Sequence, residues 1–89
     1  MKLLAAAAAA ATTNSTVGGA AAVYVVTSGA FTLSVVDSDG TAGGTDGTVL
    51  GTIEVPTGWT GIIHKYPNQF LKGGNTAAKF TKIDSGAYY

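Results

Sequence analysis

The 89-residue sequence predicts an all-β domain, and three observations support this prediction. Runs of about five to eight residues alternate between apolar and polar side chains, or are rich in β-branched and aromatic residues, as strands are. Glycine-containing turns separate these runs. After residue 16, no segment shows an apolar repeat of 3.6 residues that is long enough for a helix. Short strands between such turns are typical of a small antiparallel β-sandwich or barrel, here of about six strands.

The first element is an alanine-rich N-terminal segment. Lys2, the nine-residue apolar stretch at 3–11 and the small residues that follow are similar to a secretory signal. We expect the segment to be retained, and it is far shorter than the ~20 apolar residues of a membrane-spanning helix. Alanine favours helix, but helices shorter than about 12 residues are marginal on their own. Helix, strand, frayed tail and an arm that orders against a neighbouring subunit therefore stay open as alternatives.

The strands of the sandwich follow a joint of turn-forming residues at 12–19. The chain thus divides into an Ala-rich arm and joint at 1–19 and a β-sandwich domain at 20–89. Five strands can be placed in that domain, at 23–26, 31–36, 49–55, about 59–65 and 77–83. Alternation assigns these side chains to the core: Val23 or Tyr24, Val25, Phe31, Leu33, Val35, Ile53, Val55, Ile62, Phe80 and Ile83. We expect Trp59, which lies beside glycines, to be half exposed at the edge of the core or at an interface.

The composition excludes several classes of function. Five Lys balance five acidic residues, and there is no Arg. Zero net charge without Arg argues against nucleic-acid binding, which needs positive charge clustered on one face. The absence of Cys excludes disulfides, thiolate metal sites and thiol nucleophiles. With so few titratable side chains, we do not expect an enzyme.

The segment 37–47 is a candidate calcium loop, because it carries three Asp among glycines. An EF-hand that began at Asp37 would need Gly at position 6 and Glu at position 12, where this chain has Ala42 and Thr48. Aspartate and glycine also favour the tight backbone geometry of turns. We therefore expect a long hairpin loop and no metal site.

Other candidate sites are no stronger. His64 is the single histidine, and no Ser, Asp or Glu stands at a spacing that suggests a catalytic partner. The segment 72–79 lacks the Gly-x-x-x-x-Gly-Lys-Ser/Thr phosphate loop. Asn14-Ser15-Thr16 matches the N-glycosylation triplet, which matters only in a secreted protein. We predict no catalytic, cofactor-binding or metal-ligating residue.

The order of segments resembles that of small virion structural proteins of tailed bacteriophages, especially marine ones. The similar segments are the apolar start, the Thr/Asn/Gly joint, Ala22 to Val26, Asp37-Ser38-Asp39-Gly40-Thr41, Leu50-Gly51-Thr52-Ile53, Pro56-Thr57-Gly58, Lys65-Tyr66-Pro67 and Ala77 to Ile83. The resemblance rests on patterning along nearly the whole chain. It implies an architectural β domain in the virion that decorates or cements the capsid, or belongs to the neck or tail. The implied partners are the major capsid protein, other virion proteins and copies of itself, with no cofactor, nucleic acid or membrane.

An architectural role requires contact surfaces, and low charge density suits them because interface cores are depleted of charge. We expect the contacts to involve the N-terminal segment, the single Trp and the C-terminal tyrosines, namely Leu3, Leu4, Ala7, Ala9, Trp59, Tyr88 and Tyr89. The N-terminal arm is expected to lie on a neighbouring subunit. One alternative is a secreted carbohydrate-binding β-sandwich with Trp59, Tyr66 or Phe70 as a stacking platform. A small enzyme acting through His64 is the other.

Overall fold

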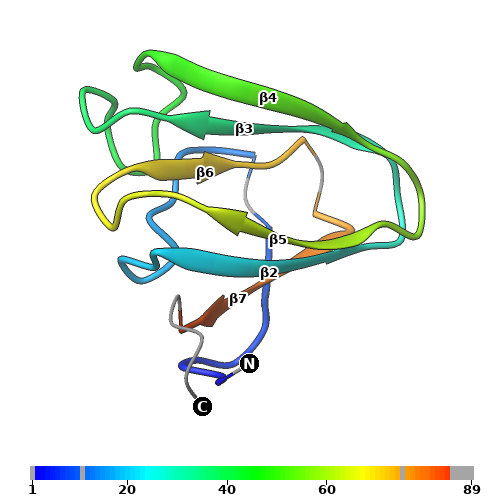
Figure 1. Cartoon of the computed structure of the whole chain (residues 1–89). Helices are drawn as coiled ribbons and strands as arrows, with labels where there is room; N and C mark the ends of the chain where they lie inside the picture. The colour runs from blue at the N-terminus through cyan, green and yellow to red at the C-terminus, as the bar shows by residue number, and fades with distance from the viewer. Residues whose placement is uncertain (1, 11, 75, 85–89) are drawn as a thin grey trace.

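The computed structural model describes residues 2–10, 12–74 and 76–84, and it confirms the all-β prediction. Seven strands form two antiparallel sheets that enclose one core (Figure 1). One sheet has the order β1-β7-β2-β5 and the other the order β4-β3-β6. The strands are β1 (Ala8–Ala9), β2 (Ala22–Thr27), β3 (Phe31–Val36), β4 (Val49–Val55), β5 (Thr60–His64), β6 (Phe70–Lys72) and β7 (Ala78–Ile83).

Period-two alternation sorts the side chains between the core and the outside. In β2, Val23 and Val25 are fully buried, and Val25 lies opposite Phe80 of β7. In β3, Phe31 and Leu33 are buried on the facing side of the other sheet. The expected core residues that are buried are Val23, Val25, Phe31, Leu33, Val55, Phe80 and Ile83. Most of the predicted core is therefore confirmed.

Three of the expected core residues are placed differently. Ile62 is exposed because Ile63, which lies opposite the buried Val23, is the residue of β5 that packs against the core. Ile53 is exposed although it pairs with the buried Leu33, because β4 is the outer strand of its sheet. Val35 is only partly buried and packs against the rim of the core.

Strand β6 was not predicted from the sequence. Its three residues are too few to show alternation, yet Phe70 and Leu71 are both buried. Leu71 lies opposite Val35 of β3 on one side. On the other side its backbone exchanges two hydrogen bonds with Ser15, at 2.7 and 3.2 Å. A short strand held from both sides thus supplies one of the largest fully buried side chains.

The N-terminal segment lies along β7 of its own chain, at the bottom of Figure 1. Ala8 and Ala9 pair with Phe80 and Lys79, and the amide of Ala10 donates to the carbonyl of Ala78 at 2.9 Å. Small side chains allow this close approach, and Ala10 itself is buried. In this structure the segment is therefore an edge of the first sheet and not a projecting arm.

Two buried polar side chains fix the loops at one end of the sandwich. The amide nitrogen of Asn14 donates to the carbonyls of Thr41 and Asp46, at 3.1 and 2.9 Å, and the residue is only 3% exposed. A glycan on this Asn-Ser-Thr triplet would be attached to the same nitrogen, which is buried here. In this fold the triplet therefore serves to hold the loop in place. The ammonium of Lys65, 7% exposed, donates to the carbonyls of Thr16 and Ala20 at 2.9 and 2.7 Å.

Candidate interaction surface

The two outer strands β4 and β5 lie on the same side of the sandwich and leave apolar side chains uncovered. The turn at 56–59 joins them, and each is paired on one side only. Four large apolar residues on these strands are 42–51% exposed: Val49, Leu50, Ile53 and Ile62. We call these four residues the β4–β5 margin. Val49, Leu50 and Ile53 belong to one sheet and Ile62 to the other, and together they are four of the seven large apolar side chains that are exposed among the described residues.

A hollow separates the two outer strands within the margin. Its volume is about 220 Å³, and its lining residues are Leu33, Val35, Gly51, Thr52, Ile53 and Ile63. Gly51 opens this hollow, because a Cβ placed on it would have no atom within 4 Å. Ile53 points toward the core side of the sheet, but among the described strands none lies beyond β4 to cover it. The core of the sandwich is thus open along this side.

A β-bulge increases the exposure of Leu50. The pairing of β3 with β4 shifts between Val35 and Val36, so Gly51 lies opposite Val35 and Val49 lies opposite Val36. Leu50 has no residue opposite it on β3. The extra residue of a bulge projects where the regular ladder is interrupted, which accounts for the half-exposed Leu50.

Strand β4 lacks most of the features that keep edge strands apart. Natural edges are commonly blocked by Lys, by Pro, by inward-pointing charges or by bulges, because an edge presents unpaired N–H and C=O groups. Of these devices, β4 has the bulge at Leu50 alone. Between Val49 and Val55 the one charged residue is Glu54, which accepts a 2.9 Å hydrogen bond from the hydroxyl of Thr32 on the neighbouring strand. The seven-residue edge is therefore open to pairing with another strand.

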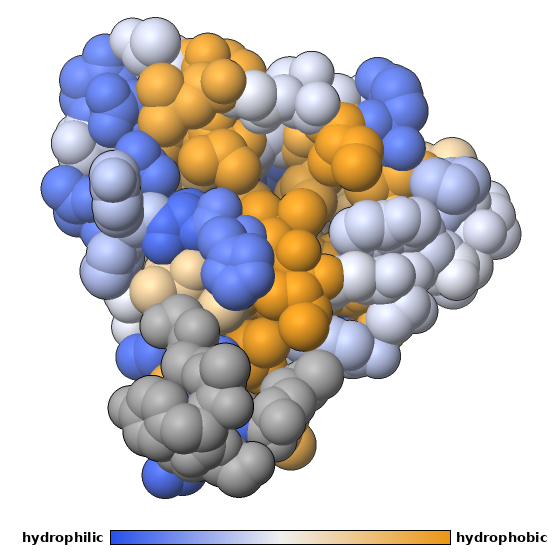
Figure 2. All heavy atoms as spheres, viewed as in Figure 1, coloured by the Kyte–Doolittle hydropathy of each residue, from blue (hydrophilic) through white to orange (hydrophobic). Residues whose placement is uncertain are grey.

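Figure 2 shows how the apolar atoms are distributed on one face of the molecule. Hydrophobic areas lie over the β4 end at the top and over β5 in the middle, with polar atoms around them. Apolar areas surrounded by polar atoms are characteristic of protein–protein contact sites.

The side chains expected to stack on sugars do not form a shared platform. Phe70 is buried, and the indole ring of Trp59 lies directly over the backbone of Gly61, where a Cβ would collide with it. Tyr66 is the one member that is strongly exposed. His64 is exposed at the end of β5. The structure therefore gives no support to the carbohydrate platform.

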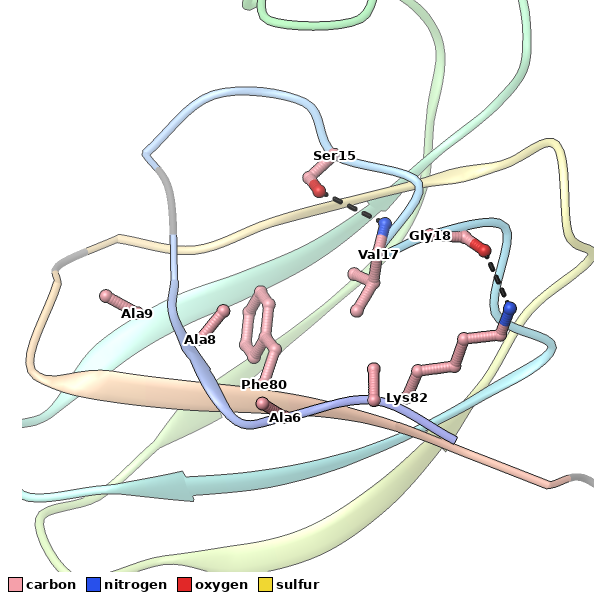
Figure 3. A pocket seen from close by; sticks show the side chains of 9 residues that line it. Ala6, Ala8, Ala9, Ser15, Val17, Gly18, Phe80 and Lys82 are labelled. Atoms are coloured by element: carbon pink, nitrogen blue, oxygen red, sulfur yellow. Dashed lines mark hydrogen bonds between the residues drawn. The ribbon is translucent and has the colours of Figure 1, made fainter. Parts of the chain in front are cut away.

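The residues expected to form interfaces fall in separate places. Leu3, Leu4, Ala7 and Ala9 are exposed along the β7 side of the first sheet, away from the margin. Beneath this segment is a hollow of about 270 Å³, into which Phe80 projects between the alanines and Val17 (Figure 3). Trp59 is half-buried at the end of the sandwich. Tyr88 and Tyr89 lie outside the described residues.

The loop at 37–47 has the turn chemistry that was expected of it. The Asp39 carboxylate accepts hydrogen bonds from the amide and hydroxyl of Thr48, at 2.9 and 2.7 Å. Asp46 does the same with Thr41, at 3.0 and 3.1 Å. These bonds, those from the backbone amides first, lower the pKa of both carboxyls. Both carboxylates therefore stabilise the conformation of the loop by accepting hydrogen bonds from Thr41 and Thr48.

The sequence pattern does not reveal the margin, because alternation assigns Ile53 and Ile62 to the core. Alternation identifies the faces of a strand but does not show which strand ends a sheet.

Among residues 2–10, 12–74 and 76–84, no three His, Cys, Asp or Glu side chains are grouped as a metal site would require. The same residues include no helix with the length and apolar character to cross a bilayer. Comparisons with protein-family models, curated proteins and solved structures gave no match for this chain.

Proposed function

We propose that this chain is a non-enzymatic structural subunit that works through contacts with other protein chains. The observation that carries the proposal is the β4–β5 margin, with four half-exposed apolar side chains beside an unblocked edge strand. Following the resemblance of its segments to virion proteins, we assign it to the virion of a tailed bacteriophage, as a capsid decoration subunit. Its partners are then the major capsid protein and further copies of itself.

The energy available at the margin suits a subunit of an assembly. Complete burial of a large apolar side chain contributes about 1.5–3 kcal/mol, so covering the exposed halves of four such residues contributes about 3–6 kcal/mol. Association alone costs an estimated 4–15 kcal/mol in lost translational and rotational freedom. One such contact does not hold two free chains together firmly. Repeated contacts on a particle hold the chains firmly, because a subunit that is already bound at one contact meets its next neighbour at a high effective concentration.

Mass spectrometry with copy counting on purified particles tests the location. Hundreds of copies per particle are expected for a shell subunit, whereas a dozen or fewer would place the chain in the neck or tail. Absence from the particles would contradict the virion assignment.

A pair of variants tests the role of the margin. Ile53→Lys places a charge at its centre and should lower the number of copies per particle at least tenfold, with an unchanged β-type circular dichroism spectrum. Thr57→Lys, in the exposed turn between β4 and β5, is the matched control and should be incorporated normally. Equal incorporation of the two variants would show that the margin is not the contact surface.

A further inference from the structure

We propose that β4 of one copy pairs antiparallel with β4 of a second copy, around a two-fold axis at Thr52. This inference rests on the proposed function, because it names a second copy of the chain as the partner at the β4–β5 margin. The pairing would join the two β4-β3-β6 sheets into one sheet of six strands, 3 from each copy. A two-fold contact of this kind uses the same patch on both subunits.

The length of β4 determines the register. The strand runs from Val49 to Val55, so its central residue is Thr52. Full overlap of two antiparallel copies therefore places Thr52 opposite Thr52. In the same register Ile53 of each copy lies opposite Gly51 of the other. Residues directly opposite each other point to the same face of a sheet, and both of these face the core side.

The hollow at Gly51 is complementary to Ile53. A Cβ on Gly51 would have no atom within 4 Å, and the adjoining hollow of about 220 Å³ is lined mainly by apolar side chains. Cavities of about 150 Å³ accommodate benzene, and the side chain of isoleucine has fewer carbon atoms. Each copy thus has a half-exposed Ile53 and, beside Gly51, an unfilled hollow large enough for the Ile53 side chain of the other copy.

Charge favours the same register. Glu54 is the one charged residue of β4. With the axis at Thr52, the two Glu54 residues are four positions apart along the strands, or about 14 Å at ~3.4 Å per residue. This exceeds the Debye length of about 8 Å at physiological ionic strength, so their repulsion is screened. An axis at Ile53 would bring them to about 7 Å, and an axis at Glu54 would oppose them directly.

The area involved makes this a weak contact between free chains. Seven residues at ~3.4 Å give a strip about 24 Å long, and a thickness of ~10 Å gives roughly 240 Å² per copy. Stable interfaces bury about 800 Å² per partner. The pair is therefore transient in dilute solution and is best detected by covalent trapping.

Cysteine cross-linking tests the register, since the chain has no Cys of its own. Thr52→Cys places two thiols opposite each other, where Cα atoms of paired strands are about 4.5–5.5 Å apart and a disulfide can form. Thr32→Cys is the matched control, because it is exposed on the same face but lies on β3. Two Thr32 residues are separated by three strand spacings across the sheet, about 14 Å, and by a further four positions along the strands, about 14 Å, so their Cα atoms are roughly 20 Å apart.

Under mild oxidation, non-reducing gels should show the Thr52→Cys dimer forming at least tenfold faster than the control dimer. Adding Gly51→Val to Thr52→Cys fills the hollow from within and should slow the cross-link at least fivefold, with unchanged circular dichroism. Equal rates for the two cysteine variants, or no effect of Gly51→Val, would overturn the proposed pairing. If pairing fails while copy counting finds the chain in virions, the pairing alone is wrong. If the cross-link forms but the particles lack the chain, the virion assignment is wrong and the pairing stands.

Discussion

Replacing Lys65 with methionine should change how the stability of this protein depends on pH. The Lys65 side chain is almost fully buried, and its ammonium donates to the carbonyls of Ala20 and Thr16. Burial first, and the nearby charge of Lys82 second, lower the pKa of Lys65 from 10.5 to about 8. Methionine has a similar length and keeps the packing, but it has no charge to titrate.

The sign of the effect follows from which state binds more protons. Below pH 8 both the folded and the unfolded chain carry a charged Lys65. Between about pH 8 and 10.5 the folded state loses this proton while the unfolded state keeps it. The free energy of unfolding therefore rises with pH in this window. A shift from 10.5 to about 8, at about 1.4 kcal/mol per pKa unit, sets an upper limit of roughly 3.5 kcal/mol for the rise.

Urea denaturation at pH 7, 8, 9 and 10, followed by Trp59 fluorescence, measures this difference. The stability of the unmodified protein relative to Lys65→Met should increase over the series by up to about 3 kcal/mol. Ionisation of tyrosines near pH 10 affects both proteins and cancels in the comparison. Lys79→Met, at an exposed site on β7, is the matched control and should run parallel to the unmodified protein. Parallel curves for the protein and Lys65→Met would refute the assignment of a buried, partly neutralised lysine.

Two further substitutions test the packing. Leu71→Ala in β6 removes a fully buried side chain and should destabilise the fold by about 2–5 kcal/mol, lowering the melting temperature by at least ~10 °C in a calorimetric scan. A loss below about 1 kcal/mol would mean that β6 is not part of the core. Asn14→Ala leaves the carbonyls of Thr41 and Asp46 without their donor, and should cost about 1–3 kcal/mol and speed amide exchange in the loop at 40–47. Unchanged exchange there would show that the Asn14 side chain does not anchor the loop, which the backbone of residue 14 also contacts.

Local patterns in the sequence were sufficient for the fold class and for most of the core. In β2 and β3, β-branched and aromatic residues alternate over a full strand length, and the buried faces follow that alternation. The turn role of Asp46 was also predictable, because an aspartate beside glycine accepts hydrogen bonds from amides of its own loop, here that of Thr41 five positions away. These features depend on neighbours within a few positions of the chain.

The margin depends on long-range contacts. Ile53 has the sequence pattern of a core residue, and it is exposed only because the sheet ends at β4. Leu71 lies in a strand too short to show a pattern, and it is buried only because β3 and Ser15 flank it. Asn14 and Lys65 gained their buried partners in the same way, from segments 27 to 49 positions away.

The sequence by itself determined that this chain folds as strands and turns, because hydrogen bonding and side-chain alternation act locally. Only the tertiary structure decided which strands end their sheets, and therefore which apolar side chains face solvent. Burial depends on what lies across the sheet and beyond its edge, and no stretch of neighbouring residues encodes that alone.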